Sequence, residues 1–203
     1  MDLTTARRAL TALAIGAIGA GCGGPVPDDA AGPDPGEPVT TQAKVARTPA
    51  GPVVWTDLVN TTVTGGTVTK TGGDPNAEDA GAVSEQTIAW GEGAFEFTVD
   101  ERTRVRFVGL GQGATWTGAA GIDFGFRLQA GHADVYEHGT WTANVDMQVG
   151  DVLRIDVAGG AVVYSKNGVA QYTSAEAPGL QLRAMTSMID AGATVAGATL
   201  SGA

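Results

Sequence analysis

Apolar and polar residues alternate with a period of two in three segments, residues 95–99, 122–128 and 153–157. Successive side chains of a β-strand point to opposite faces of its sheet, so each segment is predicted to bury one apolar face. The side chains expected on these faces are Phe95, Phe97 and Val99; Ile122, Phe124, Phe126 and Leu128; and Leu153, Ile155 and Val157. After residue 21, no window of helical length keeps the helical period.

Further strands are predicted where apolar or β-branched residues lie between glycine-rich turns. They are residues 59–64, 67–71, 82–88, 104–110, 134–138, 161–166, 169–173, 180–188 and 194–200. Many short strands within one domain indicate an all-β sandwich or barrel.

A β-hairpin is predicted around the Gly-Gly pair at 159–160. A two-residue turn there places Ile155 opposite Tyr164, and Val157 opposite Val162. All four side chains then lie on one face of the sheet, as a buried face requires.

The Asn-Gly pair at 167–168 is compatible with two kinds of loop. A two-residue turn puts Tyr172 on the face opposite Tyr164. A three-residue loop with Gly168 left-handed instead pairs Val162 with Tyr172 and keeps both tyrosines on the buried side. We favour the three-residue loop because it preserves the apolar face.

The N-terminal residues 1–21 have the form of an export signal. Two arginines precede an apolar run, residues 9–20, and Cys22 follows directly. Twelve residues span only ~18 Å as a helix, too short for the ~30 Å hydrocarbon core of a membrane. The segment resembles the helical leader of a bacterial lipoprotein, which implies lipidation of Cys22 and attachment to the cell envelope. Gly19 stands where such leaders usually carry leucine, so an ordinary cleaved signal and a secreted protein are the alternative.

Composition divides the rest of the chain. Residues 22–52 are rich in Gly, Pro, Asp and Ala, which predicts a disordered linker, and residues 53–203 form the predicted β-domain. The chain has 12 basic and 22 acidic residues, for a net charge of −10. This charge excludes nucleic acid as a partner, and leaves a lipid on Cys22 as the expected membrane contact. With one cysteine the domain has no internal disulfide.

Five short motifs occur in an order that resembles a known family. They are residues 53–56 (VVWT), 58–60 (LVN), 80–84 (AGAVS), 150–155 (GDVLRI) and 163–169 (VYSKNGV). In this order they resemble concanavalin A-like and SPRY-like jelly-roll domains, including those of bacterial cell-surface proteins. The resemblance implies a two-sheet antiparallel β-sandwich that binds glycan or protein. Fold alone does not transfer function.

The sequence does not contain the expected motifs of an enzyme. Concanavalin A-like glucanases carry a Glu-x-Asp-x-x-Glu strand, which places their carboxylates on one sheet face, and no such triplet occurs here. Glu96 and Asp100 share a strand face but are explained by an outward polar stripe. His132 and His138 accompany no nucleophile motif. We therefore predict a protein that is not an enzyme.

The loop that contains Asp74, Asn76 and Glu78 resembles a calcium loop, with Glu85 at the twelfth position. Asp79 replaces the glycine that the sharp turn of such a loop needs. An acidic surface loop is the favoured interpretation, without a cofactor, and calcium is the alternative.

Tryptophan side chains are the candidate ligand contacts, because an indole stacks on the apolar C–H face of a sugar ring. Trp55 and Trp90 are expected in the core or at a sheet edge. Trp116 lies in the flexible segment 111–118, where core packing does not require it, and Trp141 is the second candidate.

Polar groups for the hydroxyls of a ligand are expected from Gln112, Asp123 and Asn144. The predicted function is therefore an exported, lipid-anchored surface module that binds carbohydrate or protein. A structural surface lipoprotein without a small ligand is the alternative, and a glycoside hydrolase is the third.

Overall fold

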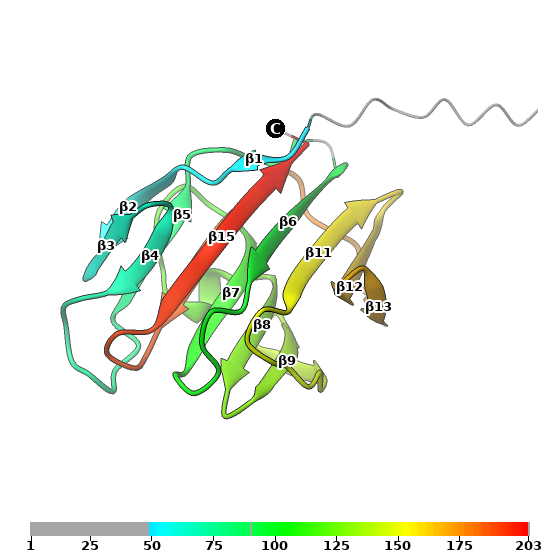
Figure 1. Ribbon diagram of the computed structural model, residues 1–203. Helices are drawn as coiled ribbons and strands as arrows, with labels where there is room; N and C mark the ends of the chain where they lie inside the picture. The colour runs from blue at the N-terminus through cyan, green and yellow to red at the C-terminus, as the bar shows by residue number, and fades with distance from the viewer. Residues whose placement is uncertain (1–48, 90, 203) are drawn as a thin grey trace, which may run out of the picture. The chain divides into compact units, whose positions relative to one another are not determined.

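A computed structural model describes residues 49–89 and 91–202. The leader, Cys22, nearly all of the predicted linker and Trp90 lie outside the described residues. Within them, two antiparallel β-sheets lie one in front of the other (Figure 1). In the described part of the chain, no helix is long and apolar enough to cross a membrane.

The sheet in front in Figure 1, here sheet A, has eight strands, with β1 pairing only with β15. In spatial order they are β13 (Val169–Thr173), β12 (Ala161–Lys166), β11 (Val152–Ala158), β6 (Gly93–Thr98), β15 (Thr194–Ser201), β4 (Thr67–Lys70) and β3 (Thr61–Thr64), with β1 (Gly51–Pro52) beside β15. The first strand pair thus begins at Gly51, at the end of the range predicted as linker.

The second sheet, sheet B, has seven strands. In spatial order they are β10 (Thr140–Ala143), β9 (His132–Glu137), β8 (Phe124–Gln129), β7 (Arg106–Gln112), β14 (Leu182–Met188), β5 (Ala80–Ser84) and β2 (Trp55–Val59). One turn of 3-10 helix, η1 (Ala119–Gly121), lies between β7 and β8.

The predicted apolar faces form the core between the two sheets. Phe97 of sheet A packs edge-on against Phe126 of sheet B, with ring centroids 6.2 Å apart. Trp55 is also buried in this core, as expected. Ile122 was predicted to share a face with Phe124, and this was wrong. It precedes β8 and packs with Val83 on the outward face of sheet B.

The hairpin at 159–160 has the predicted register, with Ile155 opposite Tyr164 and Val157 opposite Val162. The three-residue loop at 167–168 was wrong. Lys166 pairs directly with Val169, so the turn has two residues, and Asn167 and Gly168 both have positive φ.

A β-bulge in β13 places Tyr172 on the same face of the sheet as Tyr164. The register shifts by one residue beside Tyr164, so that Tyr172 lies opposite Tyr164 with ring centroids 5.8 Å apart. The extra residue of the bulge returns the apolar side chains to the buried face, which is what the three-residue loop was expected to do.

The predicted strand 59–64 is divided between the two sheets. Asn60, with φ 51°, lies between β2 of sheet B and β3 of sheet A. The pattern of apolar residues did not reveal this crossing, nor the strand β10, which carries a single large apolar side chain, Trp141.

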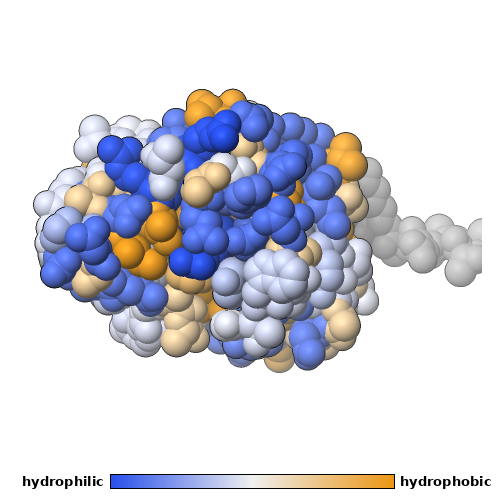
Figure 2. Space-filling view, turned by 90° about the horizontal axis from the view of Figure 1, so that it is seen from below, coloured by the Kyte–Doolittle hydropathy of each residue, from blue (hydrophilic) through white to orange (hydrophobic). Residues whose placement is uncertain are grey.

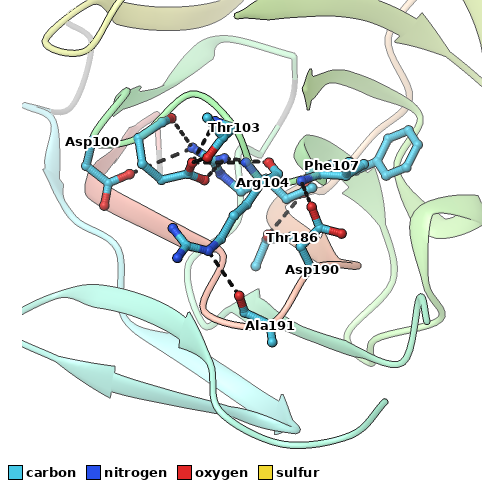
Figure 3. A network of polar contacts seen from close by, with 10 residues as sticks. Asp100, Thr103, Arg104, Phe107, Thr186, Asp190 and Ala191 are labelled. Atoms are coloured by element: carbon cyan, nitrogen blue, oxygen red, sulfur yellow. Dashed lines mark hydrogen bonds and ion pairs between the residues drawn. The ribbon is translucent and has the colours of Figure 1, made fainter. Parts of the chain in front are cut away.

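A network of polar contacts, which includes Arg104, Asp190 and Ala191, closes one end of the sandwich around a buried guanidinium (Figure 3). Arg106 lies opposite Met188 and Leu128, so its side chain points into the core, and it is 1% exposed. It pairs with Glu101 and donates to the main-chain oxygen of Arg104 at 2.9 Å. Burial lowers the pKa of Arg106, and the charge of Glu101 opposes that shift.

The loops at this end are also joined to each other. The main-chain N–H of Val105 donates to Asp190 at 2.7 Å, and Arg104 donates to the carbonyl of Ala191 at 3.0 Å. Seen from below, hydrophilic side chains predominate and hydrophobic ones form small separate patches (Figure 2). Polar contacts, rather than an apolar seal, therefore close this end.

We expect the domain to lose stability in acid. Burial alone raises the pKa of Glu101, but hydrogen bonds from Arg104 and Thr103 outweigh it, so the pKa lies below its usual value. The hydrogen bond from Lys70 lowers the pKa of Asp79. Both carboxyls bind protons more readily in the unfolded chain, so their contribution is complete above about pH 5 and disappears as the pH falls below about 4.

The measurement is the melting temperature between pH 7 and pH 2. A flat curve to about pH 5 and a decline below about pH 4 are expected, and Glu101→Gln should reduce that decline. A melting temperature that rises on acidification would contradict this assignment.

Candidate functional site

The outward face of sheet B carries a continuous row of cross-strand neighbours. From β10 to β2 the row is Trp141, Tyr136, Gly125, Gly109, Met185, Val83 and Thr56. Ile122 occupies the space over the two glycines, and Gly125 lines a hollow beside Tyr136.

This hollow has a volume of about 240 Å³ and is mostly apolar. Phe107 and Tyr136 form aromatic walls, with ring centroids 5.6 Å apart and ring planes at 82°. Ile122, which lies over Gly125, forms another wall, and η1 contributes Ala119 and Ala120. The hollow thus offers a ligand two aromatic rings and few polar groups.

Trp141 extends this apolar surface beyond the hollow. It lies directly opposite Tyr136 in the β9–β10 pair, so the two side chains are on the same face. Its side chain is 55% exposed, more than the other described tryptophans. An exposed indole beside an aromatic hollow is a platform on which a flat, partly apolar ligand can lie.

Trp116, the leading candidate from the sequence, is half-buried on the same face of sheet B. Its indole lies over Gly81 and packs with Val83 and Ile122. Its main-chain N–H donates to Asp57. The glycine leaves the space that the indole occupies, so Trp116 fastens the segment after β7 onto the sheet rather than projecting into solvent.

The structure brings two of the three predicted polar contacts together. Asp123 accepts a hydrogen bond from the main-chain N–H of Gln112 at 3.1 Å, and His138 lies 3.4 Å away on its other side. Asn144 is not part of this group. It donates to the buried carboxylate of Asp134 at 2.5 Å.

The acidic loop for which calcium was the alternative encloses an ammonium group. The Nζ of Lys70 lies 2.7 Å from the carbonyl of Asp74 and 2.7 Å from a carboxylate oxygen of Asp79. The Asp74 carboxylate caps the N–H of Asn76, and Glu78 accepts from Ala119.

Asp74 and Glu78, two of the three candidate calcium ligands, thus accept hydrogen bonds from different main-chain N–H groups. Within residues 49–89 and 91–202, no cluster of three acidic, histidine or cysteine side chains is arranged to hold a metal.

A second hollow, of about 310 Å³, lies where β7 ends. It is lined by Ala89, Gln112, Leu180 and Gln181, and the side chain of Leu180 is 60% exposed. It contains no aromatic ring among these residues. The first hollow is therefore the stronger candidate for a ligand with flat apolar faces.

Two glycines in the sequence indicated the hollow, but the alternation of apolar and polar residues does not take glycines into account. Gly109 and Gly125 lie inside predicted strands, where glycine often marks a close approach of backbone or ligand. Their pairing across β7 and β8 depends on the strand register, which a single sequence does not provide.

Comparisons with known proteins identify the fold. No protein-family profile and no curated protein sequence matches the chain. Among solved structures, the SPRY domain of human HERC1 aligns with a TM-score of 0.51 and 12% identity over 72% of this chain and 95% of that domain. The exoplasmic/lumenal domain of VIP36, in its Ca²⁺/Man-bound form, aligns with a TM-score of 0.53 and 9% identity over 72% of this chain and 82% of that one.

A Bacillus licheniformis β-glucanase also aligns, with a TM-score of 0.48 and 12% identity over 78% of this chain and 95% of that one. At these identities the likeness shows the fold alone, a concanavalin A-like and SPRY-like jelly roll. This confirms the predicted fold class.

Proposed function

We propose that the domain is a carbohydrate-binding module whose ligand lies on the outward face of sheet B, across Trp141, Tyr136 and the adjoining hollow. The observation that carries the proposal is the exposed indole of Trp141 beside two aromatic walls. VIP36, whose fold is similar, was solved with mannose bound, which supports carbohydrate over protein as the ligand class.

The size of the hollow favours one ring of a longer chain. Its volume of about 240 Å³ is below the ~300–1,000 Å³ of pockets that enclose a drug-sized ligand. A single sugar ring in the hollow, with the next ring stacked on Trp141, uses both features of the face. Asp123, next to the wall residue Ile122, is the polar group that we assign to the margin of this hollow, whereas Gln112 lines the second hollow.

The location of the module follows from the leader. We propose export and attachment through a lipid on Cys22, with the Gly/Pro/Asp-rich segment as a spacer. A module on a tether at the cell envelope can meet polysaccharide outside the cell.

A binding role rather than catalysis is supported by the partners of two carboxylates, Glu96 of β6 and Asp100 in the loop that follows it. Glu96 lies 3.4 Å from the guanidinium of Arg154, and Asp100 lies 3.7 Å from that of Arg106. Each has a structural partner, so neither stands free as an acid or a nucleophile.

Replacing Trp141 with alanine is expected to weaken binding of the full chain to its polysaccharide by about tenfold or more, because stacking on an exposed indole contributes roughly 1.5 kcal/mol. The melting temperature should stay unchanged, since the side chain is exposed. A glycan array selects the polysaccharide, and isothermal titration calorimetry measures the affinity.

Leu180→Ala is the matched control, since Leu180 is equally exposed but lines the second hollow. This control should bind like the unmodified chain. If Leu180→Ala weakens binding and Trp141→Ala does not, the ligand lies elsewhere. If the array gives no saturable response, the domain is a structural protein and the proposal fails.

A further inference from the structure

One arginine on the proposed binding face has, among the described residues, neither an ion pair nor a side-chain hydrogen bond. Arg127 points outward from β8, two residues beyond Gly125, which forms part of the hollow. It lies opposite Phe107 in the β7–β8 pair, and its guanidinium carbon is 5.7 Å from the centre of that ring. The charge therefore lies against the same aromatic ring that forms a wall of the hollow.

The nearest candidate for an ion pair is already occupied. Asp134 lies opposite Arg127 in the β8–β9 pair, but its two carboxylate oxygens accept hydrogen bonds from Gln129 at 2.9 Å and Asn144 at 2.5 Å. Two amide side chains thus hold the carboxylate, and Arg127 lies over Phe107 instead.

Across residues 49–89 and 91–202, no ion pair includes Arg127, and its buried Nε–H has no acceptor. The other described arginines have partners. Arg102, Arg104 and Arg183 donate to amide or carbonyl oxygens, and two more are paired with carboxylates. Arg154 lies 2.7 Å from Asp156, and Arg106 pairs with Glu101. The Arg127 side chain as a whole is half-buried and its other two guanidinium nitrogens are not enclosed, so an external acceptor can reach those N–H groups.

The charge of the whole chain restricts how this arginine can act. With 22 acidic and 12 basic residues, the chain carries a net charge of −10 and repels a polyanion at long range. An external carboxylate would therefore be held by direct contact with Arg127 and not by attraction from a distance.

From this geometry we infer that the module binds an acidic polysaccharide, with Arg127 holding the carboxylate of a uronic acid while the sugar ring packs against Phe107 and Tyr136. The inference rests on the proposed function and adds the class of sugar. A guanidinium donates two parallel N–H groups to a planar carboxylate, which makes arginine better suited than lysine to this ligand.

The test compares two polymers with the same ring. The full chain is titrated by calorimetry with polygalacturonate and with its fully methyl-esterified form, in which the ring remains and the charge is removed. We expect polygalacturonate to bind about 10- to 100-fold more tightly, the range for a hydrogen-bonded charge. This preference should decrease as salt is raised from 0.05 to 0.5 M.

Substitutions test whether Arg127 causes the preference for the charged polymer. Arg127→Gln should abolish the preference for the charged polymer, while Arg127→Lys should retain part of it because the charge remains without the planar fork. Arg102→Gln is the matched control, since Arg102 is exposed, outside the hollow, and bonded to Gln148. It should leave the preference unchanged.

The outcomes separate this inference from the proposed function. Equal binding of both polymers, sensitive to Trp141→Ala but not to Arg127→Gln, overturns the acidic ligand and keeps the binding face. A charge preference that survives Arg127→Gln also overturns the inference. Sulfated dextran that binds more tightly than polygalacturonate shows a general anion site rather than a carboxylate site. Binding that is insensitive to Trp141→Ala contradicts the proposed function itself.

Discussion

Replacing Arg106 with methionine is expected to lower the free energy of unfolding by about 3–5 kcal/mol, the usual cost of breaking a buried ion pair by removing one partner. Methionine fills part of the same space between Met188 and Leu128 but leaves Glu101 without its cation. Carbonyl oxygens of the loop, including that of Arg104, also lose their donor. Three contacts of the loop, two carbonyls and one carboxylate, therefore depend on this one guanidinium.

Urea denaturation followed by tryptophan fluorescence measures this loss. A second substitution, Glu101→Gln, made in the Arg106→Met background should recover part of the stability because it removes the unpaired charge. Arg104→Gln is the control on the same loop, since Arg104 is exposed and should cost about 1 kcal/mol or less. A loss below about 1 kcal/mol for Arg106→Met would show that water replaces the guanidinium.

The second large effect is expected from Lys70→Met, which should destabilise the domain by about 3 kcal/mol or more. Lys70 is 2% exposed, and besides the Asp79 carboxylate its Nζ bonds to the carbonyls of Asp74, Ala77 and Ile189. Each lost hydrogen bond from a charged donor contributes about 1.5–3 kcal/mol, and the carbonyls of Asp74 and Ala77 keep main-chain donors after the substitution. The cost of leaving the Asp79 carboxylate without its cation is not included in this figure, because that carboxylate is partly exposed to water.

Limited proteolysis and urea denaturation check this prediction together. The segment 71–79 should become the first site of cleavage, because its carbonyls and Asp79 are organised around one ammonium group. Calcium at 5 mM should leave the stability of the unmodified chain unchanged. A rise in melting temperature with calcium, absent from Asp74→Asn, would instead show that the loop binds the metal.

The sequence was sufficient for the fold where side chains alternate on one face. Phe124 and Phe126 are buried, and the register across the Gly-Gly turn is the predicted one, because a slip by one residue would have exposed every apolar side chain of that strand. The Asn-Gly turn was wrong because two solutions bury the same tyrosines, and a bulge is invisible to an alternating pattern.

The candidate site was harder to predict from the sequence, because its residues are brought together by cross-strand pairing. Trp141 was a candidate, yet its neighbour Tyr136 and the glycine floor come from strands whose register is set by tertiary pairing. Trp116 was misjudged for the same reason. Its burial follows from the absence of a side chain at Gly81, which is 35 positions away in the chain and adjacent in space.

The most direct test of the binding face is an NMR titration of the full chain, labelled with ¹⁵N, with the saccharide that the glycan array selects. The account predicts saturable shifts of the main-chain amides of Gly125 and Tyr136 and of the Trp141 indole N–H, with little change at Ala89 and Gln181. Shifts confined to Ala89 and Gln181, at the second hollow, would contradict it.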